Sequence, residues 1–169
     1  MFKLINELPN ADTSKIVMIG VSRGGINTCQ ALAKTNRIKL AILMYSPYNL
    51  FTNVERRPEM ENVILPRFVD NYWANRESEL TNRSPALWTK NISQTTPIVI
   101  FHGTDDKKSF YEEALEFKKN LESTNHSVLL ETFEQGNHGL TSHWTEQLNR
   151  TKHYLTLIKN EKPIVLYKK

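Results

Sequence analysis

The chain has 169 residues, of which 39% are hydrophobic and 24% are charged, and its formal net charge at pH 7 is +4. This length and composition predict one globular domain that is large enough to bury a hydrophobic core. Because the Lys and Arg residues are scattered along the chain, the charge gives no indication of a nucleic-acid-binding protein.

The sequence also argues against a membrane or secreted protein. No stretch approaches the roughly 18 apolar residues of a membrane span, and the first residues lack the apolar segment of a signal peptide. The single cysteine, Cys29, cannot form an intramolecular disulfide, so nothing calls for an oxidising compartment. We therefore expect a cytoplasmic protein that does not bind membranes.

The first part of the chain predicts alternating helices and strands. Residues 2–8 form a short amphipathic helix that Pro9 ends. Residues 15–20 are a β-rich apolar run, which predicts a buried strand, and residues 23–34 predict a helix. A second buried strand is expected over residues 39–45.

The last part of the chain continues this alternation. It predicts strands at residues 97–102 and 128–133 and helices at residues 109–124 and 142–159. The last helix has four apolar side chains that we expect to face the core: Trp144, Leu148, Leu155 and Ile158. Residues 162–167 predict either a small added strand or a loose tail.

Strands separated by helices predict an α/β fold with a mainly parallel sheet of about four strands. We expect a single domain over residues 1–169. Residues 47–93 interrupt the alternation and are too long for an ordinary loop. Helical fragments are expected there, for instance over residues 67–75. Such an insertion at the carboxyl ends of the strands would cover a site at that edge.

The glycines gather around three candidate functional residues, and all six lie near a Ser, an Asp or a His: Gly20, Gly24, Gly25, Gly103, Gly136 and Gly139. Glycine is needed where the backbone adopts unusual dihedral angles or approaches another group closely. This distribution indicates that the chain is built around an active site.

Ser22 is the candidate nucleophile. It lies in the sequence Gly-Val-Ser-Arg-Gly-Gly, which follows a predicted strand and opens a predicted helix, the setting of a nucleophile elbow. In that setting the backbone N–H of Arg23 would point at a developing oxyanion. The alternative is a glycine-rich turn that contains an incidental serine.

A serine nucleophile needs a base, and the base needs an orienting acid. Asp106 follows the third predicted strand, where a carboxylate can reach a histidine on the next loop. Asp105 is the rival for this role. Either aspartate is also explained as a solvated turn residue that caps the following helix.

Among the five histidines, only His138 lies in a glycine-flanked loop after the last strand, and it is the candidate base. His143 is the only substitute. His102 is expected to form a local hydrogen bond at the end of its strand, whereas His126 and His153 are expected at surface or helix positions. There is no His-x-x-x-His pair, phosphate-binding loop or dinucleotide motif, so we expect neither metal nor cofactor.

Three segments together resemble the catalytic domain of the prolyl oligopeptidase (S9) family of serine peptidases, within the α/β-hydrolase superfamily. They are Gly-Val-Ser-Arg-Gly-Gly at 20–25, His-Gly-Thr-Asp-Asp at 102–106 and Gly-Asn-His-Gly-Leu at 136–140. Stretches at 57–60 and 83–88 extend the likeness, which covers about residues 2 to 159. Each motif alone is shared with other hydrolases, such as dienelactone hydrolases and acyl esterases.

The resemblance implies a hydrolase that cleaves peptide or small acyl ester bonds through a Ser-His-Asp triad and an acyl-enzyme. It implies Ser22 as nucleophile, His138 as general base and Asp106 as the acid. Two other classes stay open: an inactive remnant or interaction module, and an esterase or dienelactone-type hydrolase. Family members usually carry an apolar residue where this chain has Ser109.

The resemblance further implies a truncated fold, because in the complete α/β-hydrolase sheet several strands precede the nucleophile. The loop that supplies a second oxyanion N–H would be missing, and so would the family's β-propeller domain. The strand at 15–20 would then form an exposed sheet edge. Through this edge the chain could form a homodimer or bind a complementing N-terminal half.

Overall fold

The structure is a computed structural model that describes residues 2–164. At its centre is a four-stranded sheet with the order β1-β2-β3-β4, and all neighbouring strands are parallel. The strands are β1 (Ile16–Val21), β2 (Ile38–Met44), β3 (Ile98–Gly103) and β4 (Val128–Phe133). The predicted four-stranded parallel sheet is confirmed. Residues 165–167, part of the predicted tail, lie outside the described residues.

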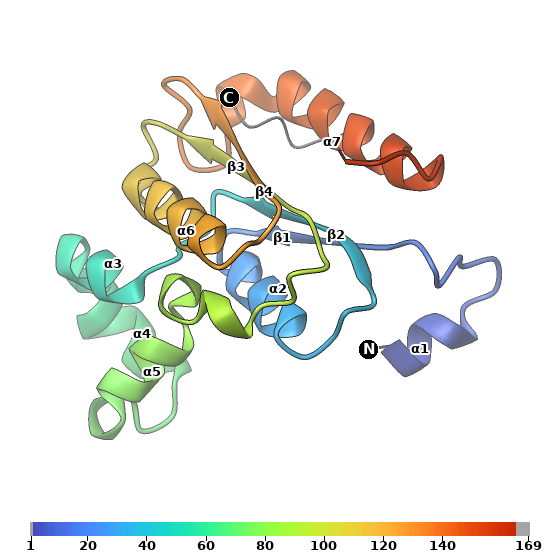
Figure 1. Cartoon of the computed structure of the whole chain (residues 1–169). Coiled ribbons are helices and arrows are strands. Elements are labelled where there is room, and N and C mark those ends of the chain that lie inside the picture. The colour runs from blue at the N-terminus through green and yellow to red at the C-terminus, as the bar shows by residue number, and fades with distance from the viewer. Residues whose placement is uncertain (1, 165–169) are drawn as a thin grey trace.

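Helices cover both faces of the sheet (Figure 1). Helices α2 (Arg23–Leu32) and α6 (Tyr111–Ser123) lie on one face, and α7 (Trp144–Lys159) lies on the other. The short α1 (Phe2–Glu7) precedes β1. Two separate apolar clusters correspond to the two faces, because successive side chains of a strand point to opposite sides. The structure is therefore an α/β fold, as predicted.

The two central strands are buried on both faces, which explains their continuous apolar sequences. In β2, Leu43 packs in the cluster with α2 and α6, whereas its neighbour Ile42 packs in the cluster with α7. In β3, Ile100 likewise packs in the cluster with α2 and α6, and Val99 packs in the cluster with α7. Continuous apolar sequences of this kind are typical of strands in a sheet that helices cover on both faces.

Strand β1 lies at the edge of the sheet and pairs only with β2 within residues 2–164. Ile19 and Val21 are 43% and 47% exposed. The expected exposed edge is confirmed. The prediction of a buried strand at 15–20 is wrong, because within the described residues no strand lies on the other side of β1. Pairing of a partner along this edge stays a prediction.

The prediction for the core-facing side of α7 is also wrong for three of its four residues. Trp144, Leu148 and Leu155 are 60%, 40% and 37% exposed, and the buried side chains are instead those of Gln147, Thr151 and Tyr154. The Thr151 hydroxyl can be buried because it donates to the Gln147 carbonyl oxygen at 2.8 Å. Ile158 does pack against the core.

The 47–93 insertion is helical, as expected. It contains α3 (Leu50–Arg56), α4 (Leu65–Phe68) and α5 (Arg76–Asn82), joined by short π and 3₁₀ turns. The helix predicted over 67–75 is interrupted, because Val69 is extended and Asn71 adopts a left-handed conformation. These helices form a lobe beside α2 and α6 (Figure 1), and their apolar side chains form a third cluster together with Ile26 of α2.

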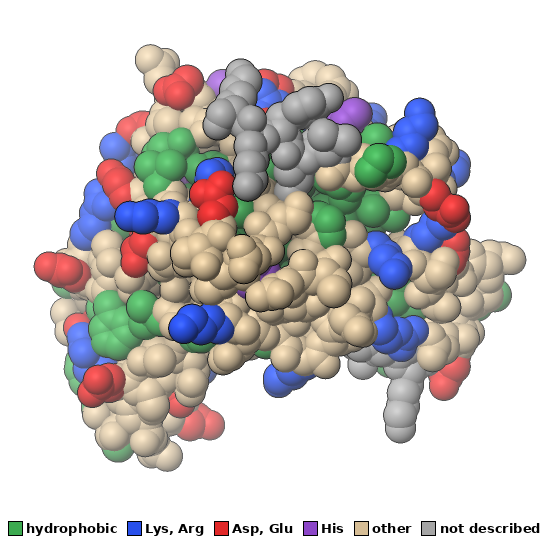
Figure 2. Space-filling view, in the orientation of Figure 1, with side chains coloured by type: hydrophobic (Ala, Val, Ile, Leu, Met, Phe, Trp, Pro, Cys, Tyr) green, Lys and Arg blue, Asp and Glu red, His purple; other side chains and the backbone are tan. Residues whose placement is uncertain are grey.

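The surface mixes charges of both signs, as the scattered Lys and Arg residues predict. On the face shown in Figure 2, basic and acidic side chains lie among each other. In the described part of the chain, no helix is both long enough and apolar enough to cross a bilayer.

Candidate active site

Ser22 occupies a sharp turn between β1 and α2. Its backbone has φ 50° and ψ −124°, a region that non-glycine residues rarely adopt. The turn is held by its N–H, which donates to the Met44 carbonyl oxygen at 2.8 Å. Gly25 allows the helix to come close, since a Cβ there would lie 2.0 Å from Oγ of Ser46. Such strain is typical of functional positions.

Three side chains from different strand ends form one hydrogen-bonded series. Oγ of Ser22 lies 3.1 Å from Nε2 of His138, and Nδ1 of His138 lies 2.9 Å from Oδ2 of Asp106. Ser22 follows β1, Asp106 follows β3 and His138 follows β4. Because the strands are parallel, their carboxyl ends meet at one edge of the sheet and bring these loops together.

Asp106 is buried, with 3% of the residue exposed. Its Oδ1 accepts hydrogen bonds from the N–H groups of Lys108 at 2.8 Å and Ser109 at 2.9 Å. Burial by itself raises the pKa of Asp106, but the hydrogen bonds from His138 and from these N–H groups hold it below its ordinary value. The carboxylate is therefore charged at neutral pH and faces the imidazole.

Ser109 itself is buried, at 2% exposure, in spite of its polar side chain. It contributes through its backbone, because its N–H binds Asp106 and its carbonyl oxygen lies 2.7 Å from Nε2 of His102. Neither contact requires an apolar side chain at this position.

The rival candidates lie elsewhere. The Asp105 carboxylate is mostly exposed and pairs with Nζ of Lys107 at 2.6 Å. In His143, Nε2 lies 2.9 Å from the Glu134 carbonyl oxygen and Nδ1 lies 3.3 Å from the Glu146 carboxylate. Neither residue has a hydrogen bond to Ser22 or His138 in the structure.

His126 is buried and lies outside any helix, so the expectation of a surface or helix position is wrong. Its Nε2 lies 3.0 Å from the Ile92 carbonyl oxygen, and Nδ1 lies 2.9 Å from Oγ1 of Thr124. Both ring nitrogens therefore have polar partners, which makes burial of the ring possible. His153 is exposed on α7, as expected.

His102 forms the expected local hydrogen bond and also supports the Asp106 loop. Since the Ser109 oxygen can only accept, Nε2 of His102 donates to it. The same nitrogen lies 3.6 Å from Oδ2 of Asp106. Burial lowers the pKa of His102, so the ring stays neutral beneath the carboxylate.

Sequence reasoning missed Tyr45, which contacts the His138 ring edge-on, with centroids 5.2 Å apart. Tyr45 has a positive φ of 40° and lies just after β2. The only local signal was its place at the end of a buried strand, immediately before Ser46-Pro47.

The backbone N–H of Arg23 belongs to the first residue of α2. It therefore has no acceptor within the helix and is available to an anion. Within residues 2–164, no group of three or more His, Cys, Asp or Glu side chains is placed to hold a metal ion.

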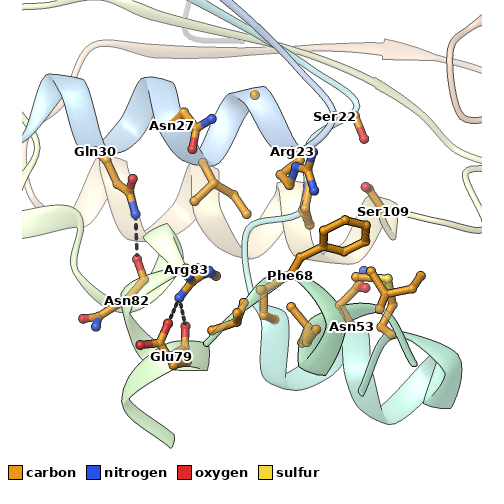
Figure 3. A pocket seen from close by; sticks show the side chains of 18 of the residues that line it. Ser22, Arg23, Asn27, Gln30, Asn53, Phe68, Glu79, Asn82, Arg83 and Ser109 are labelled. Carbon is orange, nitrogen blue, oxygen red and sulfur yellow. Dashed lines mark hydrogen bonds and ion pairs between the residues drawn. The ribbon is translucent and has the colours of Figure 1, made fainter. Parts of the chain in front are cut away.

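A cavity of about 1200 Å³ opens beside Ser22 and His138. Its walls come from α2, from the insertion and from the loops after the strands. Figure 3 shows Phe68 of α4 pointing toward Arg23 and Ser109 across the cavity. The insertion thus faces Ser22, as expected from its place in the sequence.

The model of the prolyl oligopeptidase family matches residues 2–161 of the chain. Among curated proteins, none matches the sequence significantly. The fold is similar to that of acylaminoacyl peptidase from Pyrococcus horikoshii, with a TM-score of 0.77, 21% identity, and coverage of 98% of this chain and 27% of that one.

Two further solved structures share the fold. Dipeptidyl peptidase 4 from Porphyromonas gingivalis has a TM-score of 0.75 and 19% identity, over 92% of this chain and 21% of that one. An esterase from Pyrococcus furiosus has a TM-score of 0.67 and 20% identity, over 91% of this chain and 58% of that one. The chain thus spans about a quarter of the length of the peptidases it matches.

Proposed function

This chain belongs to the prolyl oligopeptidase family, and we propose that it is a serine hydrolase that cleaves peptide or small acyl ester bonds at Ser22. The observation that carries this proposal is the hydrogen-bonded series from Ser22 through His138 to Asp106. A hydroxyl beside an imidazole whose other nitrogen faces a buried carboxylate is the arrangement that activates a serine.

In the proposed reaction, Oγ of Ser22 attacks the carbonyl carbon while Nε2 of His138 accepts the hydroxyl proton. Asp106 holds the Nδ1–H tautomer and stabilises the imidazolium that forms. The negative charge that develops on the carbonyl oxygen faces the Arg23 N–H. His138 then gives its proton to the leaving group, and water releases the acyl group from Ser22 by the same route in reverse.

An activity-based probe tests this proposal directly. A small uncharged fluorophosphonate should phosphonylate Ser22, which mass spectrometry of the digested protein would locate. Ser22→Ala should abolish labelling, whereas Ser123→Ala, at an exposed position on α6, should not change it. A folded protein whose Ser22 stays unlabelled at millimolar probe would instead be an inactive member of the family.

Esters are the second candidate substrate class. In the described part of the chain, the Arg23 N–H is the only oxyanion donor that we identify. Loss of one oxyanion donor costs about 3 kcal/mol in the transition state, and an activated ester tolerates this loss better than an amide does. Comparison of an acyl-amino-acid p-nitrophenyl ester with the matching p-nitroanilide separates the two classes. Turnover of the ester alone would identify an esterase.

A further inference from the structure

The cavity beside Ser22 is rich in positive charge. Among the residues that line it there is one acidic side chain, Glu79, and there are five basic side chains: Arg23, Lys34, Arg57, Arg83 and Lys108. These basic residues come from α2 and the turn that follows it, from the insertion and from the loop after β3, so segments far apart in the sequence contribute charge of the same sign.

Two of the five basic side chains that line the cavity are paired with carboxylates, and three are not. Glu79 of α5 is paired with Arg83, the residue that directly follows this helix, as Figure 3 shows. Arg57 pairs with Glu59 at 2.8 Å.

The other three basic side chains that line the cavity, Arg23, Lys34 and Lys108, form no ion pair with any carboxylate in residues 2–164. A cavity lined by unpaired charges of one sign concentrates ligands of the opposite sign.

Arg23 lies closest in the chain to the reacting hydroxyl. It directly follows Ser22, so the two Cα atoms are about 3.8 Å apart. Its side chain extends from the start of α2 toward Phe68 (Figure 3), and both residues line the cavity. An anion bound by this guanidinium would therefore lie within one or two residues of the carbonyl that Ser22 attacks.

The insertion adds an apolar surface to the same cavity. Phe68 is 68% exposed although it lines the cavity, and Leu65 and Val69 lie beside it. Burial of an apolar substrate group against this ring would remove its exposed area from water. The cavity therefore offers an apolar contact and a cationic contact close together.

We propose that this site takes anionic substrates, namely peptides or esters with a carboxylate one or two residues from the scissile bond and an apolar side chain next to it. This inference deepens the proposed function and rests on it. Arg23 contributes most to recognition of the carboxylate, and Lys108 and Lys34 add long-range attraction.

The kinetic test compares two substrates that differ in one charge. They are glutaryl-phenylalanine p-nitrophenyl ester and the same compound with its free carboxylate converted to a primary amide. We expect kcat/KM to be about tenfold higher for the carboxylate, because exposed charge pairs are individually weak and two of them, to Arg23 and to Lys108, act together. Raising NaCl from 10 mM to 0.5 M should reduce the ratio to about twofold, because salt screens exposed charges.

Variants then assign the preference to residues. Arg23→Gln and Lys108→Gln should each lower the ratio of the two kcat/KM values two- to fivefold. Lys152→Gln is the matched control, because Lys152 is exposed on α7 and does not line the cavity; it should leave the ratio unchanged. A ratio near one, a preference for the amide, or a preference that survives in the double variant Arg23→Gln, Lys108→Gln would overturn the proposal.

A binding measurement separates this inference from the proposed reaction. Calorimetric titration of the Ser22→Ala protein with glutaryl-phenylalaninamide, and with its neutral glutaramide analogue, needs no turnover. Tighter binding of the anion supports the substrate class even where Ser22 is not labelled by fluorophosphonate. Labelled Ser22 together with equal binding of the two compounds overturns the substrate class and leaves the hydrolase proposal standing.

Discussion

A Cβ atom built on Gly103 would lie 2.1 Å from the carbonyl oxygen of Gly136. This close approach joins the loop after β3, which carries Asp106, to the loop after β4, which carries His138. The N–H of Asp105 donates to the same Gly136 oxygen at 3.0 Å. Backbone contact between the two loops therefore sets the distance between the carboxylate and the imidazole.

Gly103→Ala should force the two loops apart. We expect it to lower the free energy of unfolding by about 3 kcal/mol, because a rigid backbone atom cannot make room for the added methyl group. Gly24→Ala is the matched control, since a Cβ there meets nothing within 4 Å, and it should leave stability unchanged or raise it by about 0.5 kcal/mol. Urea denaturation measures both variants, and equal losses would contradict the close contact.

Asp106→Asn should remove most of the hydrolase activity and preserve the fold. An amide that replaces the carboxylate no longer holds the Nδ1–H tautomer, and kcat should fall about 10⁴-fold. Asp105→Asn should change kcat less than twofold, since the Asp105 side chain contacts Lys107 at the surface. Stopped-flow or plate-reader kinetics with an activated ester distinguish them. A larger loss in Asp105→Asn would reverse the assignment.

Glu113 should make the stability depend on pH. Burial raises the pKa of this carboxyl to about 7, although the N–H groups of Tyr48 and Asn49 donate to Oε2 and partly offset the effect. Between about pH 4.5 and pH 7, the native protein holds a proton that the unfolded chain has released. The free energy of unfolding should therefore fall as pH rises through this range, by about 2 kcal/mol between pH 5 and pH 8.

Glu113→Gln should remove this decline, because the amide stays neutral and its oxygen still accepts the two N–H groups. Glu116→Gln, at an exposed position on the same helix, should keep it. The comparison is made by denaturant titration at pH 5, 6, 7 and 8. If the free energy of unfolding changes with pH in the same way for the native protein and for Glu113→Gln, the Glu113 carboxyl is charged over this whole pH range.

Two leucines test the orientation of α7. Leu148 is 40% exposed, so Leu148→Ala should cost less than about 1 kcal/mol of stability. Leu121 of α6 is fully buried, and Leu121→Ala should cost 2–5 kcal/mol, roughly, through lost contacts and a cavity. Thermal unfolding of the two variants is sufficient. Similar losses at the two positions would mean that α7 buries its apolar side.

Much of the fold could be predicted from local patterns in the sequence. The central strands were predictable because an apolar run such as residues 97–102 can be buried on both faces of a sheet, and the Ser22 turn was predictable because glycines flank a serine between a strand and a helix. The buried face of α7 could not be predicted in this way. The spacing of apolar residues does not show that a buried Thr151 hydroxyl can donate a hydrogen bond to the Gln147 carbonyl oxygen. The burial of His126 was missed because one of its partners, the Ile92 carbonyl oxygen, lies 34 residues away in the chain.

The sequence by itself determined the alternation of strands and helices, the strained position of Ser22 and the three loops that carry the candidate residues, because these follow from neighbours along the chain. Only the tertiary structure showed that Asp106, and not Asp105, lies against His138. Adjacent residues in a turn point in different directions, and the backbone N–H groups of Lys108 and Ser109 hold one carboxylate against His138 while the other faces solvent. Tertiary structure likewise gathered basic side chains from three separate segments around one cavity, a juxtaposition that spacing in the sequence does not reveal.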